Sequence, residues 1–329
     1  MSAQHPDPVV GDLSEGAILR RILARLAASH AEVGPGDDAA VLAAPDGRVV
    51  ATVDTLVHGP DFRLAWSSAF DLGWKAAAVN LADIAAMGAR PTALLVALAM
   101  PDTTRLSFVE DLASGLRAAC DELAPGCAVE GGDLTVSDTL TIAVTALGTL
   151  DGRAPVLRSG ARPGDVLAVA GDLGQAARGL GVLFARFTDA AGAPRAVDPD
   201  VLTPAERTDL AVQLRPSPPL GLGPVAADAG ATSMMDVSDG LVLDASRLAA
   251  ASGVSVLIDS AALGDDPASA LAGGEDHALL ATFAGDVPEG FRVIGRVVER
   301  TGDPVLVDGE PHDGRGGWDP YRDWDARTG

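Results

Sequence analysis

Residues 74–91 read WKAAAVNLADIAAMGARP and predict most of a long helix. Alanine and leucine, which favour helices, fill this stretch, and Gly88 and Pro91 are typical of the turn that follows a helix. We therefore expect a helix from about Ser67 to Met87, with Gly88 capping its C-terminus. This helix carries the motif NLAD at residues 80–83.

Asp83 is the most informative residue of this helix. On a helical projection it lies among apolar residues such as Val79, Leu81 and Ile84, where a lone buried carboxylate would be costly. A bound cation would offset that cost. The alternative is that Asp83 lies on a wet face of the helix beside Asn80.

Six short acidic motifs, most of them next to glycine, are scattered along the chain. They are GDD (36–38), VDT (53–55), NLAD (80–83), GGD (131–133), DVSDG (236–240) and GGED (273–276). Magnesium binds through a few carboxylates and keeps positions for water and phosphate oxygens, so such turns suit a metal that holds nucleotide phosphates. Asp and Gly are also common in ordinary turns. Six motifs together favour a magnesium and nucleotide site over six unrelated turns.

The composition indicates a compact, acidic protein of about two domains. The chain has 329 residues, of which 47% are hydrophobic, and a formal net charge of −22. This charge opposes binding to nucleic acid or to an anionic membrane surface. There is no apolar run of membrane-spanning length and no signal-peptide pattern, so we expect a cytoplasmic protein. The two cysteines, Cys120 and Cys127, fit neither a zinc site nor a disulfide framework and are expected to be reduced thiols.

Local patterns divide the chain into a first domain, residues 1–150, and a second, residues 151–329. In the first we expect a helix from Ser14 to about His30, a hairpin of residues 39–44 and 48–54 that brings Asp54 to a strand end, a strand at 92–100, a helix at 104–123, and strands at 128–130 and 139–147 on either side of GGD. In the second we expect strand, turn and helix within 161–187, a break at 216–219, strands at 232–237, 254–259 and 278–283, and a helix at 239–251. Alternating strands and helices favour an α/β or α+β fold.

Other phosphate-binding motifs do not fit the sequence. No GxxxxGK[ST] precedes the only lysine, Lys75, which excludes a P-loop, and Lys75 is interpreted as a solvated helix residue. The HRD and DFG motifs of protein kinases are absent. Residues 34–39 match GxGxxA but follow a helix, and their two aspartates would repel a pyrophosphate. By contrast, DVSDG places Asp236 at a strand end and Ser238 and Asp239 at the start of a helix, where anions are stabilised.

Taken together, these segments resemble the thiamine-monophosphate kinase family. In chain order they are GDDAAVL (36–42), VDTLVHGPDF (53–62), WKAAAVNLADIAAMGARP (74–91), GGDLT (131–135), LRSGARPGD (157–165), RPSP (215–218), MDVSDGLVLD (235–244) and GGEDHALL (273–280). The match is colinear over nearly the whole chain, and NLADIAAMGA together with VSDGL and GGED is specific. The wider relatives are ATP-dependent enzymes similar to aminoimidazole ribonucleotide synthetase.

The resemblance implies a two-domain α/β (α+β) fold, with an N-terminal α+β domain whose sheet pairs with a second subunit in a homodimer, and a C-terminal α/β domain of the aminoimidazole ribonucleotide synthetase type. It implies transfer of the ATP γ-phosphoryl group to thiamine monophosphate, with several Mg²⁺ ions, in thiamine diphosphate biosynthesis. The implied magnesium ligands are Asp38, Thr52, Val53, Asp54, Asp83, Asp133, Asp236 and Asp239, of which Asp54, Asp83, Asp133 and Asp239 are the implied catalytic residues. The implied ATP-binding residues are Gly132, Asp133, Arg158 and Ser238, and the implied thiamine contacts are Asp61, Glu275, Trp318 and Tyr321.

Some positions depart from the family pattern. Relatives carry a histidine just before the residue that corresponds to Phe62, whereas here Asp61 stands there and the nearest histidine is His58. The tail PYRDW replaces a G-aromatic-D-H-F ending, and GGDLTVSD is looser than GGDTT. At Val53, many relatives have Thr or Ser, so only its carbonyl could bind a metal. These departures concern substrate contacts more than metal ligands.

Two other functions stay open at this stage. One is another ATP-dependent synthetase of the superfamily; a selenophosphate synthetase fits less well, because it carries a reactive Cys or selenocysteine near its N-terminus and no cysteine precedes Cys120. The other is a nucleotide-binding scaffold without turnover. For a kinase we expect direct transfer without a phosphoenzyme, because a phosphate monoester is largely ionised at neutral pH and magnesium ions would screen its repulsion from ATP.

Overall fold

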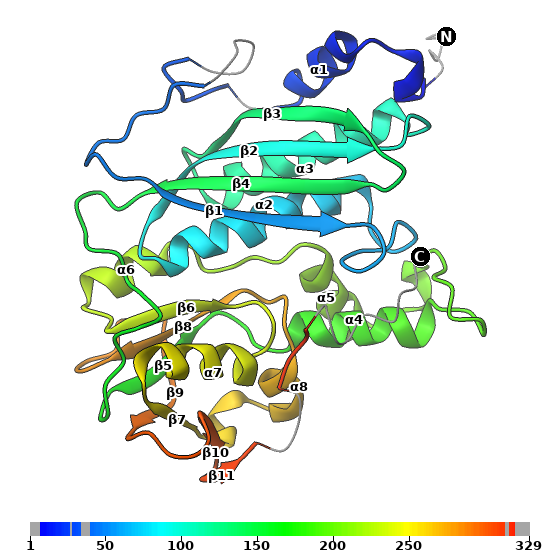
Figure 1. Cartoon of the computed structure of the whole chain (residues 1–329). Coiled ribbons are helices and arrows are strands. Elements are labelled where there is room, and N and C mark those ends of the chain that lie inside the picture. The colour runs from blue at the N-terminus through cyan, green and yellow to red at the C-terminus, as the bar shows by residue number, and fades with distance from the viewer. Residues whose placement is uncertain (1–6, 27, 34–39, 313–315, 320–329) are drawn as a thin grey trace.

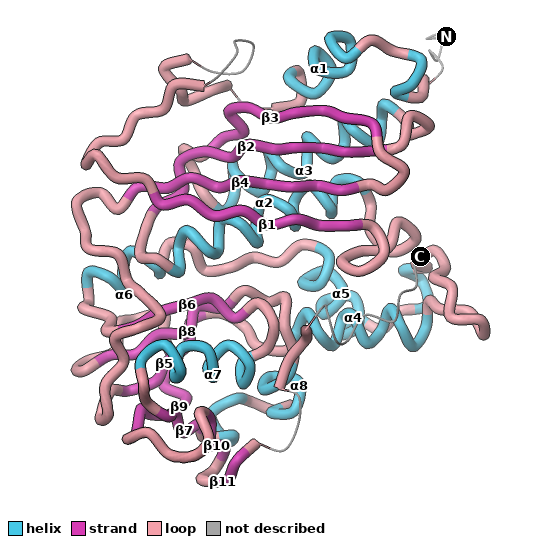
Figure 2. Tube along the Cα trace, viewed as in Figure 1, coloured by secondary structure: helices cyan, strands magenta, loops and turns pink. Residues whose placement is uncertain are grey.

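The computed structural model describes residues 7–26, 28–33, 40–312 and 316–319, which form two β-sheets with helices packed against and between them (Figures 1 and 2). The first sheet has the strand order β1-β4-β2-β3, with β1 (Val50–Val57), β4 (Thr141–Thr149), β2 (Arg90–Met100) and β3 (Ala128–Val136). In this sheet β4 is antiparallel to both of its neighbours, and β2 and β3 are parallel. The expected α/β fold class is confirmed.

The second sheet has the strand order β11-β10-β7-β9-β5-β8-β6. Its strands are β5 (Val166–Ala170), β6 (Ser233–Val237), β7 (Ser255–Ile258), β8 (Ala278–Phe283), β9 (Arg292–Val298), β10 (Val305–Val307) and β11 (Glu310–Pro311). The α-helices of the described residues are α1 (Glu15–Leu23), α2 (Ala69–Ala86), α3 (Leu106–Leu123), α4 (Gln175–Arg186), α5 (Pro204–Leu214), α6 (Leu222–Asp228), α7 (Leu241–Ser252) and α8 (Pro267–Ala272). None of them is both long and apolar enough to cross a membrane.

The central helix is α2, and the sequence predicts it well. Ser68 and Asp71 form a capping box at its start, and Gly88 adopts φ +72° just after its end. One side of α2 packs on the first sheet and on α3, and its other side contacts β6, β8, α5 and α6 (Figure 1). Almost the whole helix is therefore buried, which makes it the shared wall between the two sheets.

Two glycines allow α2 and α3 to pack unusually closely. A Cβ at Gly115 of α3 would lie 2.9 Å from the carbonyl carbon of Phe70 and closer still to its oxygen. A Cβ at Gly73 of α2 would meet the Leu112 carbonyl group of α3 in the same way. Side chains at these positions would hold the helices apart, so the two glycines set the depth at which α2 lies against the sheet.

Three predictions in the first half are wrong in detail. The predicted hairpin does not form among the described residues, because Val41 bridges Val33 and β1 pairs with β4, which leaves Asp54 inside a strand. GGD lies within the continuous strand β3 and not between two strands. Helix α1 ends at Leu23, before the predicted end, and further along the chain the buried Glu130 accepts hydrogen bonds from the Ser29 hydroxyl and the His30 N–H.

The other predicted elements are confirmed within a few residues, while α5, α8, β9, β10 and β11 were not predicted. The first sheet ends at Thr149 and the second begins at Val166. The predicted domain boundary near residue 150 falls between these strands and stays a prediction.

Candidate active site

Four aspartates from both halves of the chain face one another where the two sheets meet α2. Asp54 is on the inner face of β1, Asp83 is on α2, Asp236 is near the end of β6, and Asp239 follows it in the loop before α7. We call these four residues the carboxylate cluster. Thr52, two residues before Asp54 on β1, donates a hydrogen bond of 2.7 Å from its Oγ1 to Oδ2 of Asp83.

Asn80 fixes the first two members of the cluster relative to each other. It is 1% exposed, its Oδ1 accepts a 2.9 Å hydrogen bond from the main-chain N–H of Asp54, and its Nδ2 donates to the Ala76 carbonyl. The alternative of a wet helix face around Asn80 and Asp83 is therefore wrong. The NLAD motif instead carries one carboxylate and the amide that aligns its neighbour.

The electrostatics of the cluster show that its charges are not balanced internally. Burial, helped by the charge of the nearby Asp236, raises the pKa of Asp83 to about 7, and the hydrogen bond from Thr52 opposes this shift. The surrounding protein also raises the pKa of Asp54, to which Asp236 and Asp239 contribute, although one side of Asp54 stays open to solvent. Such shifts are characteristic of sites that bind cations or perform chemistry.

The GGED segment and His277, which follows it, form a loop that contacts the cluster at Asp236. Glu275 and His277 have positive φ angles of 72° and 55°, which are strained for residues other than glycine. The buried His277 ring lies with Nδ1 3.1 Å from Oδ2 of Asp236. Burial opposes the charged imidazole, but Asp236 outweighs it, so the pKa of His277 is raised. Asp276, between them, accepts a 2.7 Å hydrogen bond from the Ala176 N–H at the start of α4.

The turn that carries Asp239 is held by Asp244, a residue without an assigned role in the sequence analysis. Its fully buried carboxylate accepts hydrogen bonds from the N–H groups of Asp239 and Gly240, and Arg247 binds both Asp239 and Asp244 at 2.6 Å. Burial raises the pKa of Asp244 to about 6. Asp244 therefore fixes the turn that leads into α7, and no side chain of a described residue caps the helix itself.

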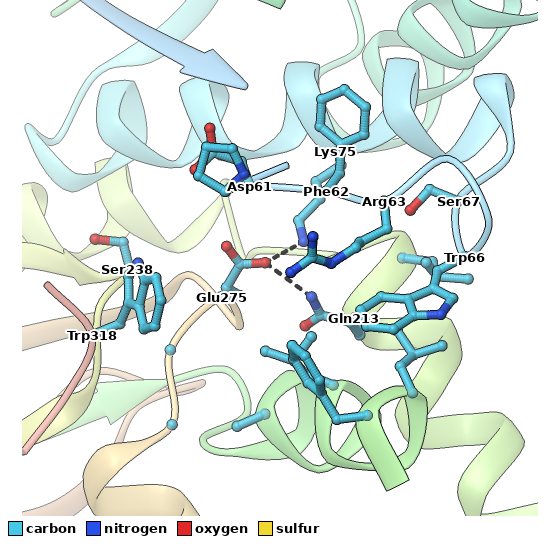
Figure 3. A pocket seen from close by; sticks show the side chains of 18 of the residues that line it. Asp61, Phe62, Arg63, Trp66, Ser67, Lys75, Gln213, Ser238, Glu275 and Trp318 are labelled. Atoms are coloured by element: carbon cyan, nitrogen blue, oxygen red, sulfur yellow. Dashed lines mark hydrogen bonds and ion pairs between the residues drawn. The ribbon is translucent and has the colours of Figure 1, made fainter. Parts of the chain in front are cut away.

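A pocket of about 570 Å³ opens beside the cluster (Figure 3). Its lining includes Asp239, which is a member of the cluster, and the adjacent Ser238. One wall is aromatic: the rings of Trp66 and Phe184 meet edge to face with centroids 5.0 Å apart. Trp318 lies on the opposite side, where its main-chain N–H donates a hydrogen bond to the Asp239 carbonyl. This shape suits a flat, heteroaromatic ligand whose charged end reaches the cluster.

The polar wall of the pocket combines Lys75, Gln213 and Glu275 (Figure 3). Lys75 is 5% exposed and forms an ion pair with Oε2 of Glu275, so its interpretation as a solvated helix residue is wrong. Nε2 of Gln213 donates a 3.1 Å hydrogen bond to the same oxygen. Asp61 also lines the pocket and accepts a hydrogen bond from the Val57 N–H. Burial raises the pKa of Asp61, and Glu275 adds to this shift.

Not all predicted site residues join the cluster within this chain. The register places Asp133 across the sheet from Thr55, whereas Asp54 is in line with Gly132. Because facing residues share a side of the sheet, Asp133 is on the opposite face from Asp54, about 14 Å across three strand spacings.

Gly132 itself serves the close approach of two strands, since a Cβ there would lie 3.0 Å from the Val96 carbonyl carbon. The carbonyl of Arg158 accepts hydrogen bonds from Ser233 and Ser252, so it lies near the start of β6, about 10 Å from Asp236. Its side chain is exposed. Val53 is 60% exposed on the outer face of β1.

Two further predicted residues, Asp38 and Tyr321, lie outside the described residues. Among the residues that are described, no group of three or more His, Cys, Asp or Glu side chains forms a preassembled metal site. The donors of the cluster and Thr52 are nevertheless all hard oxygens, which magnesium prefers. Magnesium commonly binds proteins through one or two carboxylates and takes its remaining ligands from phosphate and water, so the donor set fits this ion.

The sequence analysis missed the basic and aromatic partners of the acidic residues. Lys75, Gln213, Trp66, Phe184 and His277 were given no functional role. One signal for Lys75 was present, because a single lysine occurs in a helix that is otherwise apolar on nearly all sides. The aromatic residues carry no such local signal.

Residues 36–150 match the family model described as AIR synthase related protein, N-terminal domain. The chain is 42% identical to the thiamine-monophosphate kinase of Mycobacterium tuberculosis H37Rv over 95% of this chain and 93% of that protein. It is 41% identical to the thiamine-monophosphate kinase of Corynebacterium glutamicum over 94% of each.

Solved structures give the same picture. The thiamine-monophosphate kinase from Stenotrophomonas maltophilia K279a superposes with a TM-score of 0.74 at 34% identity, covering 91% of this chain and 98% of that one. AaThiL complexed with AMPPCP and TMP superposes with a TM-score of 0.71 at 32% identity, over 82% and 86% of the two chains. The hydrogenase maturation protein HypE of E. coli, with a TM-score of 0.65, 17% identity and 96% and 100% coverage, shares the fold alone.

Proposed function

This chain belongs to the thiamine-monophosphate kinase family and is a phosphotransferase, and we propose that it transfers the γ-phosphoryl group of ATP to thiamine monophosphate, giving thiamine diphosphate. The observation that carries this proposal is the border shared by the carboxylate cluster and the aromatic pocket at Ser238 and Asp239. A ligand whose rings fill the pocket would place its phosphate beside the cluster. A relative of this fold is known in complex with AMPPCP and TMP.

The pocket provides the recognition groups for the thiamine part. The rings of Trp66, Phe184 and Trp318 offer flat apolar surfaces, and Glu275 offers a carboxylate to a cationic or amine-bearing ligand. Asp61 occupies the position of the family histidine and lies close enough to Glu275 for that carboxylate to raise the pKa of Asp61. We assign Asp61, Glu275 and Trp318 to the substrate.

The cluster provides the ligands for magnesium. Thr52, Asp54, Asp83, Asp236 and Asp239 would hold Mg²⁺ directly or through water, with Asp38 and Asp133 contributing as the resemblance implies. Several bound ions would neutralise the phosphates, align donor and acceptor, and stabilise charge on the transferred group. The carbonyl of Val53 belongs to a strand that pairs with β4, which makes it the weakest of the proposed ligands.

The residues of the chain act by positioning. The acceptor phosphate monoester has a second pKa near 6, so it needs no general base at neutral pH. Asn80, Thr52 and His277 hold three of the aspartates in fixed orientations, which reduces the reorganisation needed during transfer. We therefore propose direct in-line transfer without a phosphoenzyme.

ATP would be bound by Gly132, Asp133, Arg158 and Ser238, and we propose a homodimer as the working state. Asp133 faces away from the cluster within one chain, so the outer face of the first sheet is the place to test for a subunit contact. Light scattering of the purified protein measures this state directly.

One assay tests the function. The purified protein is incubated with ATP, Mg²⁺ and either thiamine monophosphate or free thiamine, and thiamine diphosphate is quantified by chromatography. The proposal is supported if thiamine diphosphate forms with thiamine monophosphate and not with free thiamine. Product from free thiamine without the monophosphate would overturn it, and ATP binding without any product would favour a scaffold or another synthetase of the superfamily.

A further inference from the structure

The polar wall of the pocket contains a buried network that no catalytic step requires. Lys75 comes from α2, Gln213 from the last turn of α5, and Glu275 from the strained loop before β8. Lys75 and Gln213 are 5% and 6% exposed, whereas the side chain of Glu275 is 39% exposed. The carboxylate therefore faces the pocket while its two partners lie behind it.

The two partners bind the same oxygen of Glu275. Nζ of Lys75 and Nε2 of Gln213 both donate to Oε2 and not to Oε1. The main chain is held as well, since the Glu275 N–H donates a 2.8 Å hydrogen bond to the Ser238 carbonyl. One oxygen of the carboxylate is thus fixed, and the other is left for a ligand.

We propose that Lys75 and Gln213 are positioning residues that lock the Glu275 carboxylate with Oε1 turned towards the acceptor substrate. This rests on the proposed function, in which Glu275 contacts the thiamine part of thiamine monophosphate. Oε1 then accepts a hydrogen bond from the amino group of the substrate or pairs with its cationic ring. A carboxylate held in one rotamer loses little entropy on binding, so the network raises affinity for the acceptor and leaves ATP untouched.

A purely structural role is the competing explanation. An ion pair between α2 and the loop before β8 also ties the two sheets together, and breaking a buried pair destabilises a fold. That role predicts a loss of stability with equal effects on both substrates. The positioning role predicts a selective loss of acceptor affinity that disappears once Glu275 is neutral.

The test is a double-mutant cycle of K75M, E275Q and K75M/E275Q, with the exposed R20M as the control for loss of one positive charge. Initial rates give kcat and separate KM values for thiamine monophosphate and ATP, and circular dichroism gives the melting temperature. We expect K75M to raise the KM for thiamine monophosphate at least tenfold and to change the KM for ATP less than twofold. The KM of the double variant for thiamine monophosphate should be no higher than that of E275Q, and the kinetic constants of R20M should match those of the wild type.

Several results would overturn the proposal: effects of K75M and E275Q that multiply, equal rises in both KM values, or no change in either. If K75M does not fold, Q213L replaces it in the same cycle, with an expected rise of at least threefold in the acceptor KM alone. A wild-type protein that makes no thiamine diphosphate overturns the proposed function and this inference with it. An active wild type with a multiplicative cycle overturns only the inference.

Discussion

The contact between α2 and α3 gives a sharp test of how the fold positions the site. A methyl group at residue 115 would lie 2.9 Å from both the Phe70 carbonyl carbon and the Trp74 nitrogen, and closer to the Phe70 oxygen. The helices must separate by roughly 1 Å before that methyl reaches ordinary contact distance. Overpacking of a core typically costs about 1–3 kcal/mol, and a clash with rigid main chain belongs at the upper end.

Gly115→Ala should therefore lower the melting temperature by several degrees, at about 2–4 °C per kcal/mol for large domains. It should also lower turnover, because α2 carries Lys75, Asn80 and Asp83 towards the site and a shift of about 1 Å can cost about 100-fold in rate. We expect kcat/KM for thiamine monophosphate to fall about 10-fold to 100-fold at a temperature where the variant is folded.

The matched control is Gly181→Ala in α4, where a Cβ meets nothing within 4 Å. An alanine at this exposed helical position should stabilise the protein by about 0.5–1 kcal/mol and leave turnover unchanged. Melting curves by circular dichroism and initial-rate assays measure both effects. A Gly115→Ala variant that melts with the wild type would refute the packing argument, and one that is unstable but fully active would refute the link between helix depth and catalysis.

Three further outcomes follow from the same structure. Asp83→Asn should lower the rate of thiamine diphosphate formation by at least about 100-fold, as expected for loss of a transition-state contact. In the presence of a chelator at pH 8, however, its melting temperature should be higher than that of the wild type and of the exposed control Asp265→Asn. Burial raises the folded-state pKa of Asp83 to about 7, so the metal-free wild type loses stability as the pH rises from about 4 through 7. The variant, with a neutral amide at this position, does not lose that stability. Phe184→Ala should raise the KM for thiamine monophosphate about 2-fold to 10-fold and leave the KM for ATP unchanged, since it removes an aromatic wall of the pocket. Glu110→Gln should lower the free energy of unfolding by about 1–3 kcal/mol at pH 7, measured by denaturant titration. The difference in stability between wild type and variant should vanish at low pH. Hydrogen bonding to Arg21 holds the pKa of Glu110 below its usual value, and the stabilisation by the Glu110 carboxylate is lost as the pH falls through this lowered pKa.

Helix α2 could be predicted from sequence because its determinants are local. Ser68, Asp71 and Gly88 act on residues within one turn, so cap chemistry sets the ends of the helix regardless of its surroundings. The failed hairpin shows the opposite case. Residues 48–54 have the pattern of a strand, but their partner β4 begins at Thr141, and no local rule selects a partner so far along the chain.

The acidic half of the site was visible in the sequence, and its other half was not. Aspartates beside glycine stand out as motifs, and Asp54, Asp83, Asp236 and Asp239 do meet in the folded chain. Lys75 looked like an ordinary solvated lysine, since only the approach of the loop at Glu275 from the second sheet buries it. The pocket walls come from elements far apart in the chain, so their assembly depends on how the two sheets pack, which periodicity does not encode.

The distribution of basic partners within the site gives the strongest reason to place cations there. Among the described residues, Asp236 has His277 and Asp239 has Arg247 within ion-pair distance, but neither Asp54 nor Asp83 has a basic partner. Burial also raises the pKa values of Asp54 and Asp83. Two aspartates with a basic partner and two without one leave negative charge that bound cations would compensate. The proposed reaction brings the phosphate groups of two substrates together, so the missing positive charge is where that reaction would need it.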